Sequence, residues 1–162
     1  MTQVTAALRH QEYFVEITTV FGDQITISDS QITTFISPLI GFDHLRQFVF
    51  FQKQDGPLSW MQSLDDPQVA FCVLAPFSAG LDPDMDIAGD DVSDIKAAGT
   101  DDIDVFTLVV LDQDRAKIRT NLRAPILVGK TSRLAKQIIV DNPQLPLQFP
   151  LKALLDENPG PC

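Results

Sequence analysis

The sequence is poor in cysteine, in histidine and in catalytic motifs. Its two cysteines are too few for a disulfide framework, and Cys72, in an apolar run, is expected to be a small buried hydrophobe. His10 and His44 do not form a metal-binding pair, and Cys162 ends the chain. The sequence carries neither a phosphate-binding loop nor a nucleophile elbow. We therefore expect no metal, no cofactor and no enzymatic activity.

Basic residues are also scarce. The 162 residues include 12 Lys and Arg against 22 Asp and Glu, which gives a formal charge of −10. Phosphate binding requires clustered cations, so direct contact with nucleic acid is not expected. The longest uncharged run, residues 67–81, is shorter than the ~20 residues of a membrane helix. The first residues lack the apolar core of a secretory signal, and we expect a cytoplasmic protein without membrane contact.

What the sequence does contain is a series of short, strand-like segments. Apolar residues alternate over 13–17 and 25–27, on either side of a turn at Gly22-Asp23. Further short apolar runs, separated by proline and glycine, lie at 45–52, around Trp60, and at 69–74, 103–111, 118–128 and 134–140. This spacing predicts a mainly β, single-domain fold, an antiparallel β-barrel or sandwich with one or two short helices. Four phenylalanines are expected in its core: Phe48, Phe50, Phe71 and Phe106.

The sequence suggests three parts: an N-terminal lead over 1–11, the β domain over 12–150, and a flexible tail over 151–162. Five of the eleven prolines follow residue 142, which predicts an extended or partly disordered end. One helix is expected near residues 90–99, capped by Asp90 or Asp91 and closed by Gly99.

Charge is concentrated in two stretches. Residues 81–104 contain nine aspartates against Lys96 alone, a net charge of −8, whereas 115–136 contain seven cations and no acid. A patch of one sign can steer a partner of the opposite sign.

Within the acidic stretch, Asp82, Asp84 and Asp86 alternate with other residues. A period of two places these carboxylates on one face of an edge strand, with Met85 and Ile87 inward. The charges could block edge-to-edge aggregation or bind a partner. A calcium loop is a third alternative, although Ile87 and Ser93 stand where an EF-hand requires Gly and Glu.

Another unusual stretch covers Asn121, Leu122, Ala124, Pro125 and Ile126. Because Pro125 cannot donate to a β-ladder, it interrupts a strand pattern. The interruption could be a structural β-bulge or part of a functional surface.

Four motifs, in order, resemble those of the bacterial flagellar assembly factor FliW over roughly residues 12–150. Phe35 and Gly41-Phe42 resemble the F-x-x-G-I-P-G-F turn of that family, although Pro38-Leu39-Ile40 replaces its G-I-P. The other three matches are Gln62-Ser63 with Pro67 and Ala70-Phe71 (Q-S-x-x-x-P-x-x-A-F), Val105-Phe106-Thr107 (V-F-T), and Asn121 to Ile126 (N-L-x-A-P-I).

The resemblance implies a non-enzymatic, β-barrel-like cytoplasmic protein that binds the translational regulator CsrA. Such proteins antagonise the repression of flagellin mRNA by CsrA, away from its RNA-binding groove, and exchange CsrA for flagellin as a partner. Asp84 and Asp86 match acidic positions implicated in gripping CsrA, and we include Asp82 with them. The Asn121–Ile126 stretch is then structural or part of the partner surface.

Two alternatives remain open at this stage. One is a chaperone-like flagellin binder that does not bind CsrA. The other is a hydrolase that uses the aspartates at 101–104, which predicts an apolar pocket holding a carboxylate of raised pKa.

Overall fold

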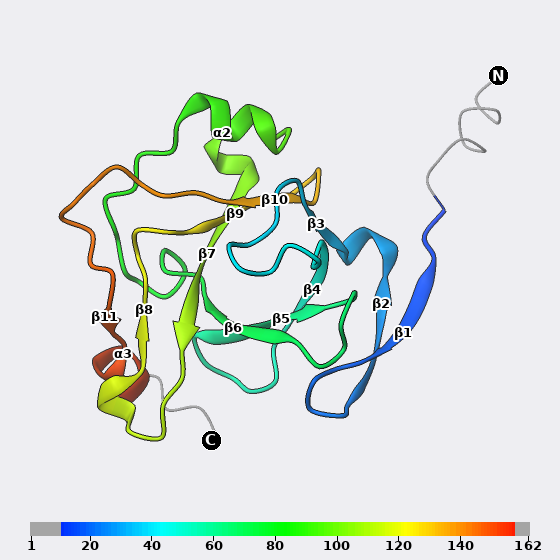
Figure 1. Cartoon of the computed structure of the whole chain (residues 1–162), viewed down its shortest axis with the longest axis horizontal. Helices are drawn as coiled ribbons and strands as arrows, with labels where there is room; N and C mark the ends of the chain where they lie inside the picture. The colour runs from blue at the N-terminus through cyan, green and yellow to red at the C-terminus, as the bar shows by residue number, and fades with distance from the viewer. Residues whose placement is uncertain (1–10, 158–162) are drawn as a thin grey trace.

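Seven short strands with alternating apolar residues close into a barrel in the computed structural model, which describes residues 11–157 (Figure 1). The strands are β3 (Thr33–Phe35), β4 (Gln47–Phe51), β5 (Leu58–Ser63), β6 (Ala70–Leu74), β7 (Ile103–Val110), β9 (Ile126–Gly129) and β10 (Leu134–Gln137). Their order around the barrel is β7-β6-β5-β4-β3-β10-β9, and β9 pairs again with β7. The predicted β-barrel is confirmed.

The barrel is antiparallel except at one seam. There β10 runs parallel to β3, with Leu134 beside Thr34 and Ala135 beside Phe35. The eight-residue β7 extends past the barrel: its first half pairs with β9, and its end pairs with β8 (Arg119–Thr120). Next to β8 lies the short β11 (Phe149–Pro150). The single strand expected over 118–128 is therefore split into β8 and β9 around Pro125.

The barrel interior is filled by side chains from alternate positions of its strands. Phe35 and Phe48 are fully buried, with their ring centroids 5.2 Å apart. Phe50, Phe71 and Phe106 are partly buried and pack against this cluster. The four phenylalanines expected in the core therefore contribute to it.

A separate hairpin, β1 (Phe14–Thr18) and β2 (Gln24–Ser28), lies to one side of the barrel (Figure 1). Gly22 adopts a φ of 86° at its turn, a conformation that costs glycine little. The predicted hairpin is thus confirmed. The hairpin tip reaches the barrel, where the Phe21 ring lies 4.8 Å from the ring of Trp60.

Gln62 joins the hairpin to the barrel. Its side chain is fully buried, and its Oε1 accepts a 2.7 Å hydrogen bond from the Val20 amide. Its Nε2 lies 3.1–3.2 Å from the carbonyl oxygens of Ser63, Pro67 and Val69, to which it donates. One amide thus satisfies backbone groups from two segments that are far apart in the sequence.

The helices are short. They are η1 (Asp29–Gln31), α2 (Gly89–Asp94), η2 (Thr100–Asp102), η3 (Arg115–Lys117) and α3 (Lys152–Glu157). The helix predicted near 90–99 exists, but its predicted ends are wrong. Asp90 and Asp91 lie in the first turn behind Ala88, which caps α2 without a side-chain hydrogen bond. The helix is over before Gly99, since Lys96 already has a φ of 55°.

The prediction of a flexible tail is wrong for residues 152–157, which form α3. Leu151, Leu154 and Leu155 follow the i, i+3, i+4 spacing of a helical apolar face, and all three are buried. They pack with Cys72 and Leu74, which point outward from β6. The prediction rested on proline content alone. Burial of the three leucines against β6 stabilises a helix in spite of the neighbouring prolines. Residues 158–162, and 1–10 of the expected N-terminal lead, lie outside the described residues.

The prediction of an edge strand over Asp82–Asp86 is also wrong. Residues 81–88 form neither helix nor strand and pair with no strand of the described chain. Pro83 has no amide N–H, and the Met85 amide donates to the Pro83 carbonyl oxygen at 2.9 Å rather than to a neighbouring strand. The alternation itself is confirmed: the three aspartates are exposed, whereas Met85 and Ile87 are half-buried against the cluster beneath α2.

The buried Cys72 should be nearly inert. Burial raises the pKa of its thiol to about 12. Because the thiolate is the reactive form, we expect Cys72 at about pH 8 to react about a thousandfold more slowly in the folded chain than in urea. A Cys162→Ser variant isolates this thiol, and labelling with a chromogenic disulfide reagent measures the two rates. Similar rates in both states would contradict the burial.

Candidate functional site

A concave surface of about 740 Å³ lies between the segment 84–88 and the segment 138–142. We call it the acidic groove. Its lining residues are Asp84, Met85, Asp86, Ala88, Asp91, Ile138, Ile139, Val140, Asp141 and Asn142. The two walls are joined directly, since the Asn142 side-chain amide donates to the Asp84 carbonyl oxygen at 3.0 Å.

Three of the four groove carboxylates carry uncompensated charge. Asp91 is neutralised by Lys136, whose Nζ lies 2.8 Å from it and 3.0 Å from Asp94. These two hydrogen bonds raise the pKa of Lys136, which therefore stays charged. No cation of residues 11–157 forms an ion pair with Asp84, Asp86 or Asp141. A cationic ligand would relieve this local repulsion.

Apolar surface accompanies the charge. Ile138 and Val140 are buried and belong to the cluster beneath α2. Ile139 points the other way and is 71% exposed at the rim. Carboxylates beside aliphatic groups suit lysine and arginine, whose long stems pack on apolar surface while their charged ends meet acids.

The wall 138–142 is held by the loop between β8 and β9. The Ile138 amide donates to the Pro125 carbonyl oxygen at 3.0 Å, and the Val140 amide to that of Arg123 at 2.8 Å. The Gln137 side chain donates to the Ala124 carbonyl oxygen at 3.2 Å. Because the strand is interrupted at Pro125, the carbonyl oxygens of this loop are available to accept hydrogen bonds from the groove wall 138–142.

Arg123 fastens the continuation of that wall. Its guanidinium Nη2 donates to the carbonyl oxygens of Leu145 at 2.8 Å and Pro143 at 2.9 Å, and its Nε donates to Leu145 at 3.1 Å. The Asn121 Oδ1 accepts from the Arg123 amide at 2.9 Å, which fixes the turn. Sequence reasoning did not select Arg123, because an arginine that binds carbonyls leaves no local pattern.

The other residues of that stretch are mostly inaccessible. Leu122, Pro125 and Ile126 are buried, and Asn121 and Ala124 are half-buried. Their burial and backbone bonds favour the structural alternative over the partner surface.

Of the predicted site residues, Asp84 and Asp86 line the acidic groove. Asp82 is exposed but is not among the lining residues. Sequence reasoning missed Ile139, Asp141 and Asn142, although an apolar run that ends in Asp-Asn-Pro marked a turn there. Their proximity to Asp84 depends on the folded barrel.

The aspartates at 101–104 do not have the environment that the hydrolase alternative requires. The Asp102 carboxylate accepts hydrogen bonds from the Ala98 amide at 3.1 Å and the Thr131 hydroxyl at 3.0 Å. These bonds lower the pKa of Asp102, whereas a general acid requires a raised one. Asp104 lies 4.0 Å from Lys130.

Residues 11–157 offer neither a metal site nor a membrane-spanning helix. No group of three or more His, Cys, Asp or Glu side chains there is arranged to hold a metal ion, so the calcium alternative gains no support. None of the helices in this range has the length and apolar character needed to cross a membrane.

Comparison with known proteins identifies the family. The sequence profile of the FliW protein family matches residues 16–151. The chain belongs to the FliW family. The resemblance found in the four motifs is therefore confirmed, and two FliW motifs have structural roles in this chain: Gln62 anchors the hairpin and the Asn121–Ile126 loop supports the groove wall.

Several FliW relatives span nearly the same length. The flagellar assembly factor FliW of Caldicellulosiruptor saccharolyticus is 30% identical over 139 residues, covering 86% of this chain and 91% of that protein. The flagellar assembly factor FliW of Magnetococcus marinus is 34% identical over 127 residues, covering 76% and 78%. A crystal structure of the flagellar assembly factor FliW matches with a TM-score of 0.76 at 26% identity, covering 85% of this chain and 96% of that one.

Proposed function

We propose that this chain is a cytoplasmic flagellar assembly factor that binds CsrA through the acidic groove. By binding CsrA it antagonises the repression of flagellin mRNA, and it exchanges CsrA for flagellin as a partner. Family membership supports the flagellar role. The observation that carries the CsrA assignment is the set of three uncompensated carboxylates beside an exposed isoleucine.

Charge complementarity explains why a basic protein would be selected. Acids concentrated on one face attract a basic partner over about one Debye length, roughly 8 Å at physiological salt, and orient it before contact. Such charges increase the association rate and fix the register more than they add affinity. The groove is open, so it accepts a protein surface or segment rather than an enclosed small molecule.

The test is a calorimetric titration of this chain with CsrA, for the wild type and for the Asp84→Lys/Asp86→Lys variant. Two reversed charges place cations against a basic partner, so we expect binding at least about tenfold weaker. A Glu16→Lys/Asp43→Lys variant changes the net charge equally at exposed positions outside the groove, and it should bind within about twofold of the wild type.

Each outcome has a distinct meaning. Unchanged affinity in the Asp84→Lys/Asp86→Lys variant overturns the groove assignment. Absence of wild-type binding overturns the CsrA function itself. If the wild type then binds flagellin but not CsrA, the chaperone-like alternative takes its place.

A further inference from the structure

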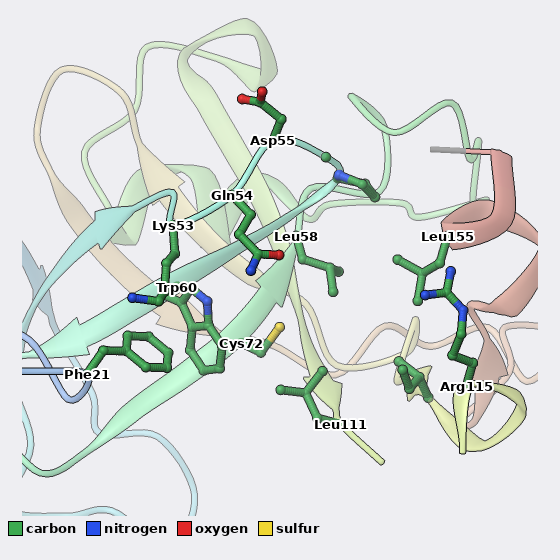
Figure 2. Close-up of a pocket in the computed structure, with 13 residues that line it drawn as sticks. Phe21, Lys53, Gln54, Asp55, Leu58, Trp60, Cys72, Leu111, Arg115 and Leu155 are labelled. Atoms are coloured by element: carbon green, nitrogen blue, oxygen red, sulfur yellow. The ribbon is translucent and has the colours of Figure 1, made fainter. Parts of the chain in front are cut away.

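A second concave surface lies on the barrel wall, apart from the acidic groove. It is a cavity of about 300 Å³ between the hairpin tip, the β4–β5 turn, the outer face of β5 and β6, and α3. Figure 2 shows Phe21 and Trp60 at one end, Arg115 and Leu155 at the other, and Leu58 and Leu111 between them. None of its lining residues is shared with the acidic groove.

The floor of this cavity is apolar and uncharged. Trp60 and Cys72 come from the outward-facing positions of β5 and β6, where they are paired neighbours. Burial raises the pKa of the Cys72 thiol, so that the floor carries no charge. Two side chains at the mouth remain open to solvent: Phe21 is 41% exposed and Leu111 is 47% exposed. Such surface commonly receives an apolar anchor side chain of a partner.

Cations stand at the two ends of the cavity. The Lys53 Nζ lies 4.5 Å from the centre of the Phe21 ring and 2.8 Å from Asp23. Arg115 lies at the opposite end, 3.1 Å from Asp156. Both ion pairs are solvent-exposed and therefore weak, and the Lys53 ammonium has more N–H donors than its bond to Asp23 uses. Asp55 is the one acid among the lining residues, and its carboxylate points away from the floor in Figure 2.

We propose that this cavity is a second docking site, for a protein segment in which apolar side chains are flanked by acidic residues. Counted without their ion-pair partners, the lining residues of the cavity carry a net charge of +1, in contrast to −4 for those of the acidic groove. The two sites would thus select partners of opposite charge. The cavity is at the small end of the range for ligand sites, about the size of one or two large side chains, which favours a peptide anchor.

The test uses Trp60, the only tryptophan in the sequence, as the reporter. A capped synthetic peptide with two central leucines flanked by glutamates is titrated against the full chain, and tryptophan emission is recorded. We expect a saturable change, and binding at least about tenfold weaker for the same peptide flanked by lysines. Equal binding of both peptides, or no saturable change, overturns the proposal.

Variants place the binding within the cavity. Leu111→Asp adds a carboxylate at an exposed position, and Lys53→Glu reverses the charge at one end of the cavity. Each variant should bind the glutamate-flanked peptide at least about tenfold more weakly than the wild type does. Lys117→Glu is the matched control, because Lys117 is exposed and does not line the cavity. Equal weakening by Lys117→Glu and Lys53→Glu would overturn the assignment. CsrA is absent from this experiment, so its result is independent of the proposed function.

Discussion

Replacing Gln62 by alanine is expected to lower the free energy of unfolding by about 4 kcal/mol. The fully buried side-chain amide accepts from the Val20 amide and donates to three carbonyl oxygens. Alanine removes the side-chain partner of the Val20 amide and of the Ser63 and Pro67 carbonyl oxygens, at about 1–3 kcal/mol for each group left unpaired. The Val69 carbonyl oxygen still accepts from the Ser63 amide at 2.9 Å. The cavity left by the lost atoms adds to that cost.

Urea unfolding of the wild type and the Gln62→Ala variant measures this difference. Gln68→Ala is the matched control, because it makes the same chemical change at an exposed position six residues away in the same region. It should stay within about 0.5 kcal/mol of the wild type. Amide hydrogen exchange should also accelerate at Val20 in Gln62→Ala. Equal stability of the two variants would contradict the role given to Gln62.

Replacing Arg123 by alanine is expected to lower the free energy of unfolding by about 3 kcal/mol. Its guanidinium makes three hydrogen bonds to the carbonyl oxygens of Pro143 and Leu145, and hydrogen bonds from a charged donor are the stronger kind. Without them the segment that follows Val140 is held less tightly, by the Asn142–Asp84 and Leu122–Pro146 hydrogen bonds. Since this segment continues the groove wall, the proposed binding of CsrA should weaken as well.

Urea unfolding and calorimetry with CsrA measure the two effects, and amide exchange at Val140 reports on the wall itself. Arg123→Lys should recover only part of the stability, because an ammonium group cannot reproduce the planar fork of a guanidinium. Arg119→Ala is the control, since Arg119 donates a single exposed hydrogen bond, to the Lys117 carbonyl oxygen. A wall that exchanges at the wild-type rate in Arg123→Ala would contradict the positioning role.

Local periodicity was sufficient for most of the fold. The alternation over 13–17 and 25–27 predicted the hairpin, and the apolar runs predicted β4 to β7 and β10. The pattern failed where tertiary contacts decide the structure. The three residues of β3 are too few for a period, and α3 follows a proline-rich stretch but is fixed by leucines that pack on β6. Residues 82–86 alternate as a strand does, yet find no partner strand.

The candidate site was half predictable. Asp84 and Asp86 stood out because their charge and spacing are visible in the sequence. The facing wall did not, because the carbonyl of Asp84 and the amide of Asn142 are 58 positions apart and meet only through the barrel. The stabilising contributions of Gln62 and Arg123 were hidden for the same reason: both side chains bind backbone atoms, which carry no sequence signature.

The parallel seam between β3 and β10 has a consequence for synthesis of the chain. Arg133 donates to the Thr33 hydroxyl across 100 positions, beside the pairing of Leu134 with Thr34. At about 5–20 residues per second, the ribosome synthesises β10, the partner of β3, several seconds after β3 itself. During that interval the edge of β3 that pairs with β10 has no partner, and an unpaired strand edge can bind other chains. Folding of this chain should therefore be completed only late in translation, when the seam closes.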